Sequence, residues 1–320
     1  MLFPDDGITK GELVAYYQEV AAAMLPLVYG RPVTLERFPN GIGKGGFYQK
    51  QASANTPDWI ERVTVPKMEG GTVTHLVLRQ PQDLAWIANQ GTIAPHVWLS
   101  RAPDLERPDL VVWDLDPASE EGDLPGVLRA ARQLHELLDE LALPAYVKTT
   151  GSRGLHVCVP LRPEASTAEV EAFAYDVARV LAARDPRRLT TEWLLEDRGG
   201  RLLLDTARNK WAQMIVAPYG VRALASAPVS TPLAWEELDD PEFGPRRHTL
   251  RTVPGRLASS NDPWAGMEAA AARFGPARER LAEVAPDLTP TAPGEVPSRF
   301  GRNDRRLRRG RRSPGASTKP

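Results

Sequence analysis

Two aspartates one residue apart give the clearest chemical signal in this sequence. Asp114 and Asp116 end an apolar run that begins at Leu110, and Pro117 follows at once. Side chains alternate along a strand, so the two carboxylates point to the same side. Like charges held in this way favour a cation between them, and Mg²⁺ or Mn²⁺ takes such oxygen ligands. The pattern predicts half of a metal site; the simpler alternative is a strand end whose acids cap the next turn.

A third acid and two arginines extend the same chemistry. The apolar run 201–204 ends in Asp205, so it repeats the pattern of a strand that delivers a carboxylate. Arg208 follows three residues later, and Arg222 follows the next predicted strand, 213–219. Guanidinium groups pair with phosphate oxygens. If the third acid lies near the first pair, the set makes a two-ion site for phosphate chemistry.

A predicted hairpin supplies further donors. Strands over 145–150 and 155–160 flank a Gly-Ser-Arg-Gly turn. The hydroxyls of Thr150 and Ser152, together with an inward-facing His156, can donate hydrogen bonds to a triphosphate. This arrangement indicates a nucleotide-binding turn.

The glycine-rich segment 37–50 combines three kinds of residue that suit nucleic acid. It has four glycines, which let the backbone approach a ligand, and then Phe47, Tyr48 and Lys50. It is not a P-loop, because no Gly-Lys-Ser/Thr opens a helix. Stacking faces and a lysine are what a single strand or unpaired end requires. A flexible hairpin with core aromatics is the alternative.

The surrounding pattern predicts alternating helices and strands that would position these residues. Capping boxes at Thr9 and Ser166 open two helices, and Lys10 lies in the first turn of one of them, where free amides favour anions. Such a lysine either holds a phosphate or is simply solvated. Further helices are expected over 83–90, 124–141 and 264–284, and further strands over 72–78 and 93–98. His96 lies on the last of these strands, and a lone histidine is more often structural.

Composition places the chain among ordinary soluble proteins. It has 320 residues, 42% of them hydrophobic and 25% charged, which allows one large domain or two small ones. It shows neither an apolar run of membrane-spanning length nor a secretory pattern at its N-terminus. The single cysteine, Cys158, excludes an intrachain disulfide and a cysteine-based zinc site. These features predict a cytoplasmic protein, which its nucleic-acid chemistry would associate with the nucleoid.

Charge is distributed unevenly along the chain. Nine of the 40 Lys and Arg and one of the 41 Asp and Glu lie in the segment 299–320, so the rest has 31 basic and 40 acidic residues and a net charge of −9. We expect a Pro-rich linker and a basic, disordered tail over 286–320, after a catalytic domain over 1–285. The tail either attracts polyanions or serves only as a solubilising end.

The order acid-x-acid, hydroxyl turn with x-His, and apolar-Asp resembles the three motifs of the archaeo-eukaryotic primase superfamily. Within it, the chain is most similar to the polymerase domain of bacterial ligase D, an end-joining repair enzyme. Eight segments carry the resemblance in order: ITKGELVAYY, GRPVTLERFPNGIGKGGFYQK, PHVWLSR, VVWDLDP, VKTTGSRGLHVCVPL, LLLDTARNKWAQMIVAPYGVRA, APVSTPLAWEEL and RTVPGRL with the DPW beyond it.

This resemblance implies an α/β (α+β) fold, in which an RRM-like antiparallel sheet with flanking helices joins a second α/β unit. It implies DNA-directed nucleotidyl transfer that fills gaps and extends ends, with two Mg²⁺ or Mn²⁺ ions and an NTP or dNTP as substrate. The implied metal ligands are Asp114, Asp116 and Asp205. The implied nucleotide-binding residues are His96 (near the sugar), Thr150, Ser152, His156, Arg208 and Arg222. The implied DNA-binding residues are Lys10 and Lys50 (5′-phosphate) with Phe47 and Tyr48 (template bases).

Two departures from the family pattern affect its partners. The family places a further lysine just ahead of the stretch matching Leu2-Phe3-Pro4, where this sequence starts. This sequence also shows no Lys-x-Asp-Gly ligase motif and no segment that resembles a metallophosphoesterase domain. We therefore expect a stand-alone polymerase or an excised domain that acts on DNA ends and gaps with a 5′-phosphate. A separate DNA ligase and a Ku-like end-binding protein would be its partners.

Two other functions fit parts of the pattern. A haloacid-dehalogenase-type phosphatase also begins with an apolar strand and Asp-x-Asp, but it wants Thr or Val where Ala118 stands. A DNA-end-binding module without catalysis would not need all three acids. Nucleotide addition to a gapped duplex would distinguish the polymerase from both.

Overall fold

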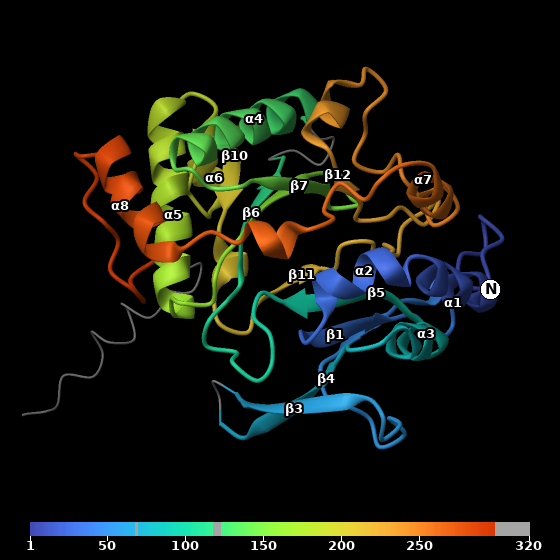
Figure 1. The fold of residues 1–320 in the computed structure, drawn as a ribbon. Coiled ribbons are helices and arrows are strands. Elements are labelled where there is room, and N and C mark those ends of the chain that lie inside the picture. The colour runs from blue at the N-terminus through green and yellow to red at the C-terminus, as the bar shows by residue number, and fades with distance from the viewer. Residues whose placement is uncertain (68–69, 118–122, 298–320) are drawn as a thin grey trace, which may run out of the picture.

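Two six-stranded sheets form the framework of the protein (Figure 1). The computed structural model describes residues 1–67, 70–117 and 123–297. The first sheet contains β1 (Pro32–Arg37), β2 (Phe47–Gln49), β3 (Glu61–Pro66), β4 (Thr72–Val77), β5 (Thr92–Trp98) and β11 (Met214–Val216). The second contains β6 (Leu110–Asp116), β7 (Tyr146–Thr149), β8 (Leu155–Pro160), β9 (Leu189–Thr190), β10 (Leu202–Asp205) and β12 (Pro232–Leu233). The helices are α1 (Lys10–Glu19), α2 (Ala21–Val28), α3 (Pro81–Asn89), α4 (Leu124–Glu140), α5 (Thr167–Arg184), α6 (Leu195–Arg198), α7 (Val253–Ser259) and α8 (Phe274–Val284), with 3-10 turns η1 (Ile42–Lys44), η2 (Ala207–Asn209), η3 (Trp235–Asp239) and η4 (Met267–Ala270).

The first sheet is antiparallel and has the strand order β11-β5-β1-β4-β3, with β2 added to β1. Helices α1, α2 and α3 lie together beside it in Figure 1, and one continuous core joins them to the sheet. Leu13 and Tyr17 of α1, Ile87 of α3 and Val97 of β5 are among the buried members of that core. The predicted capping box at Thr9 is confirmed, because the Thr9 hydroxyl accepts from the Glu12 amide and the Glu12 carboxylate accepts from the Thr9 amide.

The second sheet has the order β12-β7-β8-β6-β10-β9 and is antiparallel except for the pair β9–β10. Helices α4 and α5 cover one face of it in Figure 1, and their apolar sides share a core with the sheet. Trp113 and Leu115 of β6 belong to this core. Alternation along β6 therefore turns Asp114 and Asp116 to the opposite face. The expected α/β (α+β) class with antiparallel sheets and flanking helices is confirmed.

Two expected elements are shorter than the sequence predicts. The helix expected over 264–284 begins only at Phe274, because Ala272 pairs with the end of β8: its amide donates to Pro160 and its carbonyl accepts from Arg162. The strand expected over 213–219 ends at Val216, because Pro218 lacks an N–H and Tyr219 has a φ of +65°.

Ordered contacts continue past residue 285. The Thr291 hydroxyl donates to Asp176 of α5 at 2.6 Å, and Arg179 donates to the Thr289 carbonyl at 2.8 Å. The structure thus holds part of the predicted linker against α5, whereas the predicted basic tail at 299–320 lies outside the described residues. Among the described helices, none combines the length and apolar character needed to cross a bilayer.

Candidate active site

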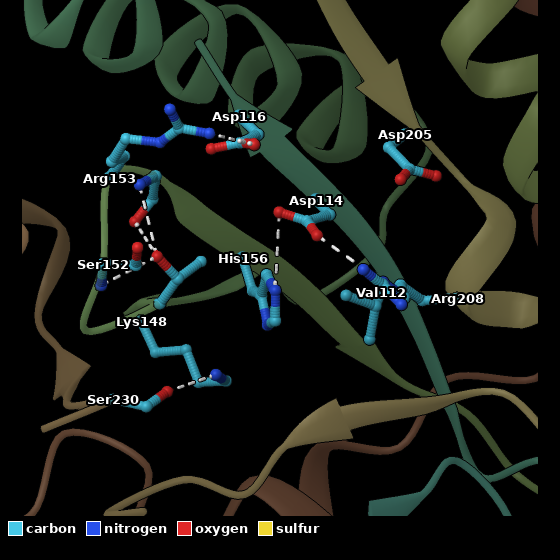
Figure 2. A network of polar contacts seen from close by, with 12 residues as sticks. Val112, Asp114, Asp116, Lys148, Ser152, Arg153, His156, Asp205, Arg208 and Ser230 are labelled. Atoms are coloured by element: carbon cyan, nitrogen blue, oxygen red, sulfur yellow. Dashed lines mark hydrogen bonds and ion pairs between the residues drawn. The ribbon is translucent and has the colours of Figure 1, made fainter. Parts of the chain in front are cut away.

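Three acids project from neighbouring strands of the second sheet. Asp205, the last residue of β10, lies directly opposite Asp114 in the antiparallel register, and Asp116 lies two residues further along β6. Directly opposed residues have β-carbons only about 5 Å apart. The three carboxylates therefore share one face of the sheet (Figure 2). The sequence fixes the direction of the first two, but only the register brings Asp205 to them.

Basic groups surround the acids without neutralising all of them. The His156 Nε2 atom lies 3.5 Å from Asp114 Oδ1, and the Arg208 Nε atom lies 3.6 Å from Asp114 Oδ2. Arg153 Nη2 is 3.4 Å from Asp116 Oδ2 (Figure 2). Asp205 instead accepts a hydrogen bond of 2.7 Å from the Ala207 amide.

The acids differ in how easily they ionise. Burial, followed by the charge of Asp114, raises the pKa of Asp205 to about 6 and also raises the pKa of Asp116. Burial would raise the pKa of Asp114 as well, but its contacts with His156 and the charge of Arg208 outweigh burial and lower that pKa. Crowding of like charges is therefore built into this face of the sheet.

The donor set suits a hard divalent cation. Three carboxylates on adjacent strands offer only oxygen ligands, and a cation would relieve the repulsion that, after burial, raises the pKa values of Asp116 and Asp205. Among the described residues, no group of three or more His, Cys, Asp or Glu side chains is already arranged around one point. The reason is visible in Figure 2, where Asp116 turns to Arg153 while Asp114 faces His156 and Arg208. Cation binding would thus compete with these contacts of the carboxylates.

A cavity of about 330 Å³ opens in front of the acids. The first sheet lines one side through Tyr48, His96 and the strand β11, and the second sheet lines the other. All six residues that were predicted to bind the nucleotide, from their motifs or from the resemblance, line this cavity. These six are His96, Thr150, Ser152, His156, Arg208 and Arg222. The structure therefore brings the whole predicted nucleotide set together.

The turn between β7 and β8 is shaped to approach β6 closely. A β-carbon on Gly154 would lie 2.2 Å from the Leu115 carbonyl oxygen, so only glycine fits there. The Thr150 hydroxyl is already engaged: it donates to the Gly154 carbonyl and accepts from the amides of Ser152 and Gly154. Thr150 thus holds the turn, and Ser152 remains available to a ligand.

The predicted DNA-binding residues divide into two groups. Phe47 and Tyr48 on β2 are 50% and 61% exposed, so both rings are accessible for stacking. Tyr48 also lies at the cavity, where its ring meets that of His96 edge to face at 5.5 Å. Lys10 at the start of α1 and Lys50 after β2 are also exposed, and they lie on different elements.

Three further polar residues at the site make contacts that the sequence does not predict. Arg153, predicted as a possible phosphate donor of the turn, pairs instead with Asp116, and the sequence does not predict that pairing. Glu36 of β1 binds His96 Nε2 at 3.1 Å. Lys148 of β7 is fully buried behind His156 and donates to Ser230 at 2.5 Å, and burial lowers the pKa of Lys148 to about 7. Lys148 could have been noticed from the sequence, because a lysine inside an apolar strand is unusual. No local pattern points to Glu36.

Known proteins are similar to this chain in sequence and in fold. Residues 9–264 match the family described as LigD, primase-polymerase domain. The chain is 33% identical over 271 residues to the multifunctional non-homologous end joining protein LigD of Mycolicibacterium smegmatis and 34% identical over 284 residues to the LigD of Pseudomonas aeruginosa. These alignments cover 84% and 88% of the chain. They cover 35% and 33% of the relatives, so the chain spans about a third of their length.

A solved structure agrees with these matches. The polymerase domain from Mycobacterium tuberculosis ligase D in complex with DNA superposes with a TM-score of 0.79 at 32% identity. The superposition covers 85% of this chain and 96% of that domain. The resemblance inferred from the eight sequence segments is confirmed at the level of family and fold.

Proposed function

Because the chain belongs to the LigD primase-polymerase family and is thereby a nucleotidyltransferase of the polymerase type, we propose that it adds nucleotides to DNA ends and gaps during end-joining repair. The observation that carries the proposal is the register of Asp205 against Asp114, in front of a cavity lined by the predicted nucleotide residues. The substrate is an NTP or dNTP opposite a template base.

In this proposal the chain's own residues bind and orient the triphosphate. Arg208 and Arg222 pair with phosphate oxygens, and the Ser152 hydroxyl donates to the same group. His156, whose pKa is lowered to about 4 by burial and then by Lys148, is neutral at pH 7 and offers a ring N–H rather than a charge. Preoriented donors of this kind stabilise the charge that develops during phosphoryl transfer.

Asp114, Asp116 and Asp205 would hold the metal on which this family of nucleotidyltransferases depends, and we propose two Mg²⁺ or Mn²⁺ ions. Such ions lower the pKa of a primer hydroxyl and neutralise the triphosphate. If Asp116 held a cation, Arg153 would lose its pairing with this carboxylate and could pair with the triphosphate instead.

DNA would be bound beside the cavity. The exposed rings of Phe47 and Tyr48 suit unpaired template bases, and Lys10 and Lys50 suit a 5′-phosphate. The likeness to a domain in complex with DNA supports this assignment. A separate ligase and a Ku-like end-binding protein would complete repair in the cytoplasm, at the nucleoid.

The test is extension of a labelled, 5′-phosphorylated gapped duplex with single NTPs or dNTPs and Mn²⁺ or Mg²⁺. Templated addition is expected with wild type and none with Asp116→Ala. Release of inorganic phosphate in place of extension would support a phosphatase. A gel shift without extension in either metal would support the binding module without catalysis.

A further inference from the structure

The loop that follows β10 is fastened to β6 by a single buried side chain. The ladder between β10 and β6 ends at the pair Asp205–Asp114. The backbone N–H and C=O of Val112, two residues before Asp114, nevertheless have hydrogen-bond partners on the β10 side of β6. The Asn209 side-chain oxygen accepts from the Val112 amide at 2.9 Å, and its amide nitrogen donates to the Val112 carbonyl at 2.7 Å. The same nitrogen donates to the Thr206 carbonyl at 2.9 Å. One side chain thus takes the place of a strand partner.

Only an amide can make this set of contacts at that length. Asn209 is 2% exposed, so bulk water cannot replace the hydrogen bonds that it makes with these backbone groups. An aspartate would accept from the Val112 amide but would face two carbonyls with no donor, and an aliphatic side chain would leave all three groups unpaired. The choice of residue is therefore dictated by the contacts rather than by helix or strand propensity.

The contacts hold the backbone segment from which Arg208 projects. The 3-10 turn η2 (Ala207–Asn209) sets Arg208 immediately before the fastened residue, and its Nε atom lies 3.6 Å from Asp114 Oδ2. The Arg208 side chain is 43% exposed and lines the cavity, so few contacts of its own would hold a long, flexible chain in place. Beyond it, Trp211 packs edge to face on Trp98 of β5 at 5.1 Å. The segment is therefore held against both sheets.

We propose that Asn209 is a positioning residue for the reaction: by bridging the Val112 backbone it holds Arg208 over the cavity, ready for the incoming triphosphate. The inference rests on the proposed function, because it assumes that Arg208 binds phosphate. Asp205 is held separately by its register with β6 and by the Ala207 amide. Loss of Asn209 should therefore act through Arg208 and leave the acids in their strands.

A double-mutant cycle on single-nucleotide addition to the gapped duplex tests this role. Asn209→Ala should lower kcat/KM for the nucleotide by about tenfold, the equivalent of one or two buried hydrogen bonds. In an Arg208→Ala background the same change should cost less than about threefold, because its target is gone. Asn209→Ser, which removes less of the side chain, should give a smaller loss in the same direction if the alanine variant does not fold.

Trp235→Phe is the matched control, because it removes another side-chain hydrogen bond to a backbone carbonyl, that of Trp235 to Ala145 at 2.8 Å, away from the cavity. It should lower the melting temperature and leave kcat/KM unchanged. Equal loss from Asn209→Ala with and without Arg208, or loss of melting temperature alone, would overturn the inference. If wild type adds no nucleotide with either metal, the proposed function is refuted. If wild type is active and the Asn209→Ala variant is equally active, only the role of Asn209 is refuted.

Discussion

Replacing Asp205 by asparagine should make the metal-free protein more stable while removing its activity. The carboxylate is held partly buried beside Asp114, and these two causes raise its pKa from 3.8 to about 6. Asparagine keeps the shape and can still accept the 2.7 Å hydrogen bond from the Ala207 amide. The change therefore removes the crowded charge and little else.

The size of the gain follows from linkage. The unfolded chain binds this proton only below about pH 3.8, whereas the folded protein keeps it up to about 6, so the carboxylate lowers the free energy of unfolding as pH rises through that window. Two pKa units correspond to roughly 3 kcal/mol. Because Asp205 is not fully buried, solvent screening reduces this to about 1–2 kcal/mol.

Urea unfolding of wild type and Asp205→Asn in EDTA, at pH 7.5 and pH 4, measures the difference. The variant should be more stable at pH 7.5, and the gain should shrink at pH 4, where the folded wild type is largely protonated. Added Mn²⁺ should stabilise wild type and not the variant, because only a protein that binds the ion gains from it. A variant that is no more stable than wild type at pH 7.5, or a gain independent of pH, would refute the electrostatic argument.

Three further outcomes concern catalysis and DNA. Asp114→Ala should abolish extension while end binding in a gel shift stays within about threefold, since the proposed role of the acid is to hold cations and not DNA; parallel loss of both would argue against a metal role. Lys10→Ala and Lys50→Ala should each reduce the preference for a 5′-phosphorylated gap over a 5′-hydroxyl gap without stopping synthesis, and unchanged discrimination would put the phosphate pocket elsewhere. Deleting 299–320 should weaken DNA binding and flatten its dependence on salt concentration, because fewer counterions are released; an equal slope would mean that this segment does not contact DNA.

Local rules predicted the parts of this protein that depend on near neighbours. The direction of Asp114 and Asp116 follows from alternation along one strand, and the capping boxes at Thr9 and Ser166 follow from hydrogen bonds that span three residues. Both are confirmed. The helix expected from Trp264 begins only at Phe274, because a backbone pairing with a strand more than 100 residues away overrides the first part of the local helical pattern.

The sequence by itself determined which chemistry is available: three carboxylates at strand ends, a hydroxyl-bearing glycine turn and arginines suited to phosphate. Tertiary structure alone decided that Asp205 lies opposite Asp114, that the cavity is closed on one side by His96 and that Glu36 holds this histidine. Register between strands separated by about 90 residues is set by the packing of whole sheets. No short pattern encodes it, because a strand carries the same alternation whichever partner it meets.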